Sequence, residues 1–341
     1  MHIRYLSLTN FRNYARLELS LPQGPLLLHG GNAQGKTSLL EAIYLLATGS
    51  SPLASSDREL IRWQAEAEGL PYARARAEVQ RRERSIELEV VLEKRELSNG
   101  TDRLQKTIRI DRSQKRQSNL SGKLNVVLFT PQSVDLVAGS PSGRRQYMND
   151  AISQVDETYS EALSHYTKAL RQRNAALRHV RDEGGNPTQL SPFESVLART
   201  GVEIATRRRA FLNGLSARVK RIHEQLTGGA EWLRLDYVPN FDPDAPPILK
   251  AEVGMDVSEQ TEPSESSDPE RLSQAYERAL VERRSEEIAR GVTVFGPHRD
   301  ELRFIAGSPA LGTHEVDLGT YGSRGQQRTA VLSLKLAELR W

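Results

Sequence analysis

The chain has 341 residues, which favours two domains, and 38% of the residues are hydrophobic and 27% charged, as in soluble proteins. No apolar run approaches about 20 residues, which excludes a bilayer span. Cysteine is absent, the seven histidines lack metal-ligand spacing and the N-terminus lacks the apolar stretch of a signal peptide, so we expect a cytoplasmic protein without disulfides or thiolate metal sites. The net charge is +3, with 38 arginines among 47 basic residues, an enrichment that suits phosphate recognition but that genomic base composition also produces.

The first fifty residues change from the pattern of strands to that of a helix. Residues 2–8 and 17–21 alternate polar and apolar side chains, which predicts a β-hairpin with a polar turn at residues 11–14. Residues 26–29 are a short apolar run, typical of a strand buried on both faces. From Thr37 onward apolar residues recur at helical spacing until Gly49. The predicted order is therefore strand, loop, helix.

The loop before this helix has the spacing G-x-x-x-x-G-K-[ST] of a phosphate-binding P-loop. Glycines let backbone N–H groups wrap the phosphates, the lysine neutralises the outer phosphates and the hydroxyl ligates Mg²⁺. The helix that follows places its N-terminus at the phosphates, which strengthens the prediction. We therefore expect a nucleotide with Mg²⁺, the metal held through the threonine, at Gly30, Gly31, Asn32, Ala33, Gln34, Gly35, Lys36 and Thr37.

Residues 72–130 contain several alternating segments, chiefly 85–92, 107–110 and 126–129, which predict a mostly antiparallel sheet beside the P-loop unit. Residues 103–123 are basic with one acidic residue, whereas residues 252–270 are acidic without any basic residue. The first segment can face nucleic acid and the second cannot. The candidate DNA contacts there are Arg109, Arg112, Lys115 and Arg116, with a solvated charged surface as the alternative for each.

The pattern becomes helical after residue 141. Apolar residues from Tyr147 to Leu177 fall at three- and four-residue spacing along one long charged helix, and a second helical stretch covers about residues 193–226. A Gly-Gly-Asn-Pro turn separates them, which predicts an antiparallel helical hairpin. Residues 255–271 are rich in Ser, Glu, Asp and Pro without periodicity and are expected to be disordered. A helix over 272–289 and a strand over 292–295 follow.

Near the end of the chain, residues 321–328 lead into a strongly helical run. Ser323, Gly325 and Gln326 match Ser-x-Gly-Gln and resemble the signature of ABC ATPases. Small residues and a serine hydroxyl at a helix N-terminus present donors to an anion. In the ABC family that anion is the phosphate of ATP on the opposing subunit's P-loop. The resemblance implies ATP sandwiched in a homodimer; an ordinary helix start is the alternative for this segment taken alone.

Five segments spread over nearly the whole chain resemble the RecF family of bacterial recombination mediators: residues 10–14, 39–43, 131–145, 172–174 and 296–301. The most specific is Gly-Ser-Pro followed by the paired Arg144 and Arg145. Two positions depart from the family, which usually has an acidic residue at Gln132 and Asp at Asn149. The resemblance implies an ATP-dependent dimer that binds junctions of single-stranded and duplex DNA, works with other recombination mediators and helps to load the recombinase.

Two site predictions and one expectation about ATP turnover depend on this resemblance. The opening residues are also similar to the heads of SMC and double-strand-break-repair ATPases, which implies that Arg12 returns over the bound phosphates or ribose. Arg144 and Arg145 become candidate DNA contacts, with a solvated surface as the alternative. ATP turnover is expected to be slow, DNA-stimulated and linked to DNA release.

In ABC-type heads the signature helix is followed by a buried strand that ends in Asp and by a catalytic carboxylate, and neither occurs before Trp341. Without both carboxylates the phosphoryl-transfer machinery is incomplete, so we identify no catalytic residue and expect the sequence to be a piece of a longer one. Two other classes stay open. One is an SMC-type chromosome-organising head, which the short helical insertion disfavours, and the other is a nucleotide-binding adaptor without turnover.

The predicted fold class is α/β: an ABC-type ATPase head, with a P-loop mixed sheet and flanking antiparallel strands, plus a helical hairpin subdomain. We expect the head to comprise residues 1–130 and 292–341. The helical subdomain is expected at 131–254 and 272–291, and the acidic linker at 255–271.

Overall fold

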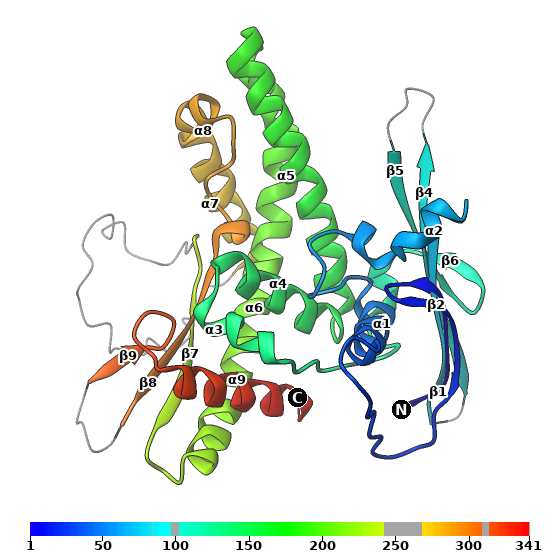
Figure 1. Ribbon diagram of the computed structural model, residues 1–341. Coiled ribbons are helices and arrows are strands. Elements are labelled where there is room, and N and C mark those ends of the chain that lie inside the picture. The colour runs from blue at the N-terminus through cyan, green and yellow to red at the C-terminus, as the bar shows by residue number, and fades with distance from the viewer. Residues whose placement is uncertain (83, 97–101, 242–267, 309–313, 341) are drawn as a thin grey trace. The chain divides into compact units, whose positions relative to one another are not determined.

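The computed structural model describes residues 1–82, 84–96, 102–241, 268–308 and 314–340 (Figure 1). The chain divides into two compact units, Met1–Leu128 with Ser153–Ser160 and Phe129–Ile152 with Glu161–Trp341. The sequence predicts that residues 292–341 belong with residues 1–130. This division instead places them in the second unit, because their helix packs on the long helix α6 (Ser191–Leu226) of that unit.

The first unit contains a six-stranded antiparallel sheet with the order β2-β1-β3-β4-β5-β6. The predicted hairpin is confirmed, because the first two strands pair across a two-residue turn at Arg12 and Asn13. The expected strands at 85–92 and 107–110 are also present. The bounds are β1 (His2–Phe11), β2 (Tyr14–Ser20), β3 (Tyr72–Gln80), β4 (Ser85–Glu96), β5 (Asp102–Ile110) and β6 (Ser113–Lys115).

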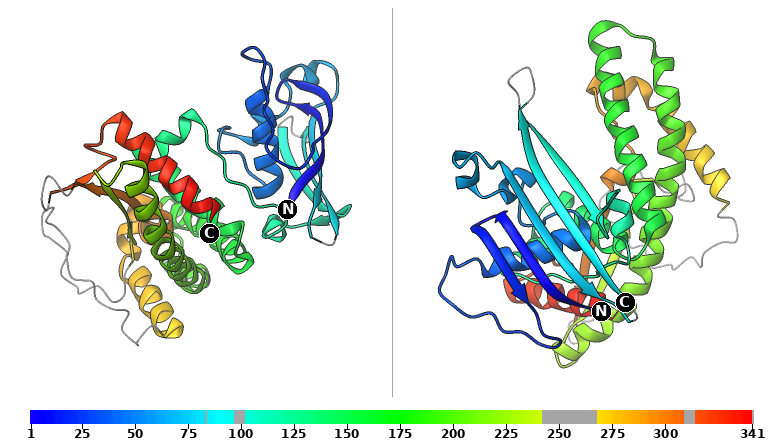
Figure 2. Two further views of the ribbon diagram at one scale, coloured as in Figure 1. Left: turned by 90° about the horizontal axis from the view of Figure 1, so that it is seen from below. Right: turned by 90° about the vertical axis from the view of Figure 1, so that its right-hand side faces the viewer.

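Helix α1 (Lys36–Thr48) covers one face of this sheet (Figure 2). Alternate residues of β3 point into the core and are small, which lets the helix approach the strand closely. The buried leucines of α1, among them Leu39 and Leu45, fill the space between helix and sheet. Three short helices complete the unit: η1 (Asp57–Leu60), α2 (Trp63–Ala67) and η2 (Gln117–Leu120).

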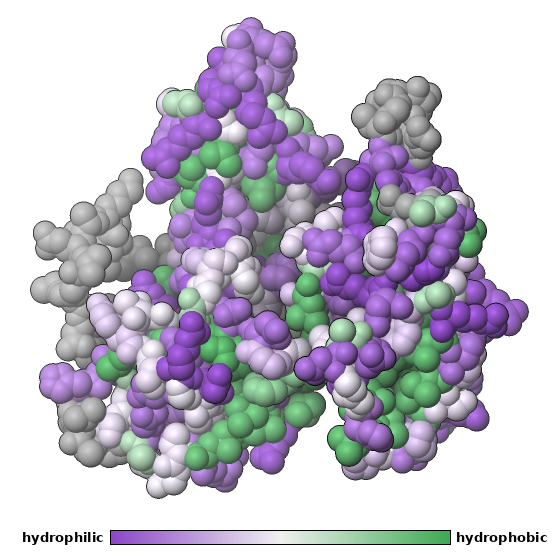
Figure 3. Space-filling model, in the orientation of Figure 1, coloured by the Kyte–Doolittle hydropathy of each residue, from purple (hydrophilic) through white to green (hydrophobic). Residues whose placement is uncertain are grey.

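The predicted buried strand at residues 26–29 is wrong. These residues have no strand structure, and Leu27 is 86% exposed, with Leu26 and Leu28 about half exposed. An extended segment becomes a buried strand only when neighbouring strands satisfy its backbone groups, and no described strand pairs with this one. Apolar surface is visible on the lower part of the first unit, where the segment between β2 and α1 runs (Figure 3).

Two long helices dominate the second unit. Helices α5 (Glu157–Glu183) and α6 run antiparallel and are joined through η4 (Pro187–Leu190), which confirms the predicted helical hairpin (Figures 1 and 2). The prediction of one continuous helix from residue 147 is wrong, because α4 (Pro141–Ser153) ends before α5 begins. The side chain of Asp156 accepts a hydrogen bond from the backbone N–H of Tyr159 at 2.9 Å and so starts a new helix. The elements η3 (Pro131–Val134) and α3 (Asp135–Ala138) precede α4.

The remaining elements of the second unit pack on α6. Strands β7 (Trp232–Val238), β8 (Glu301–Gly307) and β9 (Glu315–Asp317) form an antiparallel sheet in that order. Helices α7 (Pro269–Glu282) and α9 (Arg324–Leu339) lie against α6, and α8 (Arg284–Arg290) and η5 (Pro297–Arg299) connect α7 to β8. The helix expected at 272–289 is therefore two helices, the first of which starts earlier. Residues 255–267 of the expected linker lie outside the described residues.

The strands predicted at residues 126–129 and 292–295 are also wrong. Side chains, not a neighbouring strand, satisfy backbone N–H groups in both segments. The amide of Val126 donates to the side chain of Gln154 at 2.8 Å, and those of Thr293 and Val294 donate to Asn174 and Glu287, each at 2.8 Å. An apolar run is thus extended without belonging to a sheet.

Charged side chains interrupt every long helix of this protein. Over the residues that the structure describes, none of the helices is both long enough and apolar enough to cross a membrane.

Candidate functional site

Residues 30–37 form a tight loop that ends at the first turn of α1. Gly35 is the N-cap of this helix with φ of 93°, and Gly30 and Ala33 have φ of 149° and 62°, so the loop has positive φ angles at three places. The unpaired N–H groups of the first helical turn form an anion site. The ammonium of Lys36 donates to the carbonyl oxygens of Gly30 at 2.8 Å and Gly31 at 2.6 Å, and so lies over the loop.

The β1–β2 turn supports this loop directly. The hydroxyl of Tyr14 donates to the carbonyl of Gly35 at 3.2 Å, and the amide of Asn13 donates to the carbonyl of Ala33 at 3.5 Å. A Cβ at Gly35 would lie 2.7 Å from Asn13 and 2.8 Å from Tyr14. The glycine is therefore required both by its backbone angle and by the close approach of the hairpin.

Arg12 lies at the turn with φ of 52°, a strained conformation for a residue with a side chain. Its guanidinium donates to the buried carboxylate of Glu41 on α1 and, at 2.9 Å, to the carbonyl of Glu59. The hydrogen bond to Glu41 raises the pKa of Arg12, with partial burial opposing it. The charge of Arg12 is thus fixed at the edge of the P-loop, as its predicted role requires, although its contact with phosphate or ribose stays a prediction.

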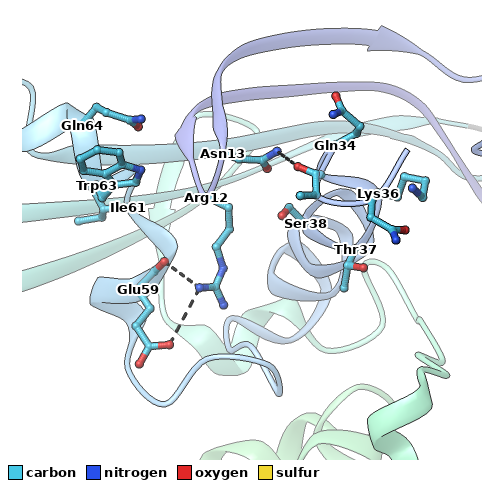
Figure 4. Close-up of a pocket in the computed structure, with 13 residues that line it drawn as sticks. Arg12, Asn13, Gln34, Lys36, Thr37, Ser38, Glu59, Ile61, Trp63 and Gln64 are labelled. Atoms are coloured by element: carbon cyan, nitrogen blue, oxygen red, sulfur yellow. Dashed lines mark hydrogen bonds and ion pairs between the residues drawn. The ribbon is translucent and has the colours of Figure 1, made fainter. Parts of the chain in front are cut away.

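A cavity of about 580 Å³ opens beside the P-loop, within the range of small-ligand sites (Figure 4). Seven predicted nucleotide-binding residues line it, whereas Gly30 and Gly31 do not line it and accept hydrogen bonds from Lys36. Of the other lining residues, which the sequence did not predict, Asn13 and Ser38 adjoin predicted ones in the chain. The rest belong to a distant segment that the isolated bridge between Phe11 and Ile61 brings to the P-loop. The predicted residues are Arg12, Asn32, Ala33, Gln34, Gly35, Lys36 and Thr37, and the missed ones are Asn13, Ser38, Glu59, Ile61, Trp63 and Gln64.

Thr37 is the residue that fits the expected Mg²⁺. It lies in the first turn of α1 and lines the cavity. Across the described ranges, no group of three or more His, Cys, Asp or Glu side chains gathers into a metal site. The available ligands therefore suit a cation that is coordinated mainly by phosphate oxygens of the nucleotide and by the hydroxyl of Thr37.

The predicted signature lies in the second unit, at the start of α9. Ser323 is the N-cap: its hydroxyl accepts from the backbone N–H of Gln326 at 3.2 Å, and the Gln326 side chain accepts from the Ser323 N–H at 2.9 Å. Gln326 also donates to Glu231 at 2.8 Å. Ser323 and Gly325 are exposed. The predicted helix start is confirmed, and its contact with the phosphate of a second subunit stays a prediction.

The six candidate DNA contacts fall into two groups. Arg112, Lys115 and Arg116 are exposed at and beyond the β5–β6 hairpin of the first unit. Arg109 lies on β5 and pairs with the buried carboxylate of Glu89 at 2.6 Å. The hairpin residues therefore present their charge outward, whereas Arg109 is paired with a carboxylate that it shares with Arg74.

Arg144 and Arg145 have structural partners in the second unit. Arg144 donates two hydrogen bonds to the carboxylate of Glu301, at 2.6 and 2.9 Å, and Arg145 donates to the carbonyl of Asp300 at 3.1 Å. Burial lowers the pKa of Arg145. Both arginines therefore fasten α4 to the start of β8. This arrangement favours a structural role over DNA contact.

The remaining family segments are also structural. Arg173 is fully buried and donates to Glu194 at 3.0 Å and to Glu287 at 2.6 Å, which ties α5 to α6 and α8. Arg208 donates to Asp300 at 2.7 Å and to the amide oxygen of Asn149 at 2.8 Å. Asn149 thus joins the buried Arg208 and Asp300 in one hydrogen-bonded cluster.

The chain is similar to known proteins over nearly its whole length. The AAA domain family matches residues 5–225. The DNA replication and repair proteins RecF of Chloroflexus aggregans and Roseiflexus castenholzii are each 40% identical to it, and the matches cover 99% of this chain and 81% and 82% of those proteins. The solved structure of the recombination mediator protein RecF-ATP in the RecFOR pathway has a TM-score of 0.79 at 27% identity, with 99% of this chain and 80% of that chain covered. The predicted ABC-type head with a helical hairpin is thereby confirmed as the fold class, and the chain belongs to the RecF family of DNA replication and repair proteins.

Proposed function

We propose that this chain is an ATP- and Mg²⁺-dependent DNA-binding protein of recombinational repair and replication-fork maintenance. It acts in the cytoplasm, dimerises on ATP, binds junctions between single-stranded and duplex DNA and works with other recombination mediators to load the recombinase. The observation that carries this proposal is the cavity formed by the P-loop and the Arg12 turn. The similar solved structure of RecF-ATP supports the choice of nucleotide.

ATP binding is supported by the geometry of the loop. Lys36 already points over Gly30 and Gly31, where the outer phosphates of a triphosphate would replace two carbonyl oxygens as its acceptors. Lys36→Ala is expected to weaken ATP binding by roughly 10- to 100-fold, the loss of a charged hydrogen bond. Calorimetric titration with Mg-ATP measures this, and unchanged affinity would refute the proposed site.

ATP-dependent dimerisation is supported by the exposed N-terminus of α9. Ser323→Ala removes both the helix cap and the hydroxyl offered to a phosphate, whereas Ser323→Asn keeps a capping side chain. We expect both variants to remain monomeric with ATP in sedimentation experiments, and only Ser323→Ala to lose about 1 kcal/mol of stability. Dimerisation of Ser323→Asn at the unsubstituted level would contradict this role.

DNA binding is supported by the outward charge of Arg112, Lys115 and Arg116. If these side chains contact phosphates, replacing all three with Ala lowers the slope of log K against log salt by about three. Arg16, an exposed cation on β2, supplies the control substitution. Titration of gapped and fully duplex DNA at several salt concentrations tests both the contact and the junction preference, and an unchanged slope would exclude this surface.

Turnover distinguishes the enzyme from an adaptor that only binds nucleotide. Phosphate release by the protein is expected to be slow and to rise when DNA is added. If the unsubstituted protein binds ATP but releases phosphate no faster than the Lys36→Ala variant, a nucleotide-binding adaptor without turnover would be favoured.

A further inference from the structure

Trp63 is an unusual residue on the rim of the nucleotide cavity. Its side chain is 80% exposed although it is the largest apolar residue there. A single exposed apolar residue needs no explanation by itself. Trp63, however, lines the same cavity as the P-loop and Arg12, so a nucleotide bound there would lie near its exposed ring.

The backbone around Trp63 is held in place. The N–H of Arg12 donates to the carbonyl of Leu60, and the N–H of Arg62 donates to the carbonyl of Asn10, each at 2.8 Å. Between these two bonds, Ile61 forms a bridge with Phe11. The indole is thus exposed on a backbone segment that is held in place, and the β1–β2 turn with Arg12 fixes the position of that segment.

The position of Trp63 suits the base of a nucleotide. In Figure 4 the ring lies at one end of the cavity and Lys36 at the other, with Arg12 and Asn13 between them. A triphosphate on the P-loop therefore directs its nucleoside across the turn toward the indole. Ile61 adds apolar surface beside the ring.

We infer that Trp63 is the stacking platform for the base of the bound nucleotide and that it makes the site prefer purines over pyrimidines. This rests on the proposed binding of ATP at the P-loop. An indole offers a flat π-face that every base can stack on, and the two fused rings of a purine cover more of it than a single pyrimidine ring. Trp63 acts on affinity and on base preference, while Lys36 acts on the triphosphate.

Four proteins test the inference: the unsubstituted chain, Trp63→Ala, Trp63→Phe and Leu70→Ala. Leu70, also exposed and apolar, follows α2 but does not line the cavity, and serves as the matched control. Binding of Mg-ATP, Mg-CTP and inorganic tripolyphosphate is measured by calorimetry. Trp63→Ala should raise the Kd for ATP about 5- to 150-fold, the range that a stacked base is worth, and leave tripolyphosphate unchanged.

Trp63→Phe should retain most of the ATP affinity, and Leu70→Ala should retain all of it. The preference for ATP over CTP should be smaller in Trp63→Ala than in the unsubstituted chain. The inference is overturned if Trp63→Ala binds ATP normally, or if ATP and tripolyphosphate weaken equally, since that indicates a distorted P-loop. The failure of the proposed function looks different: Lys36→Ala would then leave both ligands unaffected. Because the indole is exposed, the melting temperature of Trp63→Ala should match that of the unsubstituted chain.

Intrinsic fluorescence gives an independent readout. The sequence contains three tryptophans, at positions 63, 232 and 341. ATP should quench the emission of the unsubstituted chain and of Trp232→Phe, but not of Trp63→Phe. Quenching that persists in Trp63→Phe would contradict a stacked base at this position.

Discussion

Arg12 and Glu41 form a two-point ion pair at the edge of the P-loop, with N–O distances of 2.8 Å from Nε and 2.6 Å from Nη2. Glu41 belongs to the helix that follows the P-loop, and its side chain is 4% exposed. The hydroxyl of Ser51 also donates to it at 2.5 Å. The pair therefore links the β1–β2 turn to α1 and determines where the Arg12 charge lies before any nucleotide binds.

Breaking this pair from either side should destabilise the first unit. Arg12→Ala leaves a buried carboxylate without its cation, so we expect a loss on the order of 1–3 kcal/mol in urea unfolding, and a similar loss for Glu41→Ala. In a double-mutant cycle the two losses should overlap by more than about 0.5 kcal/mol, because the residues share one interaction. Strictly additive losses would show that the pair is energetically unimportant.

Two of the three P-loop glycines, Gly35 and Gly31, should respond differently to a methyl group. Gly35→Ala places a Cβ within 2.8 Å of the Asn13 and Tyr14 side chains at φ of 93°, and should cost on the order of 1–3 kcal/mol and weaken ATP binding. Gly31→Ala meets nothing closer than Gln34 at 3.8 Å and should leave stability within about 0.5 kcal/mol. Thermal melts of both variants compare the positions, and equal losses would contradict the close approach of the hairpin.

Arg144→Ala should affect stability more than DNA binding. Its two hydrogen bonds to Glu301 are partly buried, so removal is expected to cost about 1–3 kcal/mol while the salt dependence of DNA binding stays unchanged. The triple substitution of Arg112, Lys115 and Arg116 should do the reverse. A lower salt slope in Arg144→Ala would restore this residue as a DNA contact.

The second unit should lose stability in mild acid because of His298. Its Nε2 lies 3.0 Å from the carbonyl of Thr293 and its Nδ1 lies 2.7 Å from the hydroxyl of Tyr166. If Nε2–H donates to the carbonyl, Nδ1 accepts from the tyrosine, which the neutral ring alone can do. Burial lowers the pKa of His298 to about 4, opposed by the Thr293 carbonyl and assisted by Arg299 and Arg145.

The sign follows from proton binding. Between pH 6.5 and 4 the unfolded chain binds a proton that the folded chain does not, so the contribution of His298 is complete above pH 6.5 and is lost as the pH falls through this window. We expect a loss on the order of 2 kcal/mol between pH 7 and pH 5. His298→Asn should remove this part of the slope in urea unfolding. Burial also lowers the pKa of His223, but His223 is present in the unsubstituted chain and in His298→Asn, so its effect cancels when their two slopes are subtracted. An identical slope in both would exclude His298 as the cause.

The sequence alone determined the features that depend on local order. The spacing of glycines, lysine and threonine specified the P-loop and the helix after it, because an N-terminal helical turn and a glycine bend are short-range structures. Alternation specified the β1–β2 hairpin, and helical periodicity specified the antiparallel pair α5 and α6. Ser323 and Gln326 specified the start of α9, because a capping box is complete within four residues.

Only the tertiary structure decided which residues surround the nucleotide cavity and which charges are available. Ile61, Trp63 and Gln64 reach the P-loop through a backbone bridge to Phe11, a pairing that no local pattern encodes. The partner of Arg144 could not be predicted, because sequence shows a charge but not its partner, and Glu301 lies 157 positions away; DNA contact by Arg144 stays a prediction. The apolar run at residues 26–29 was misread for the same physical reason: a strand exists only where another segment of the chain accepts and donates its hydrogen bonds.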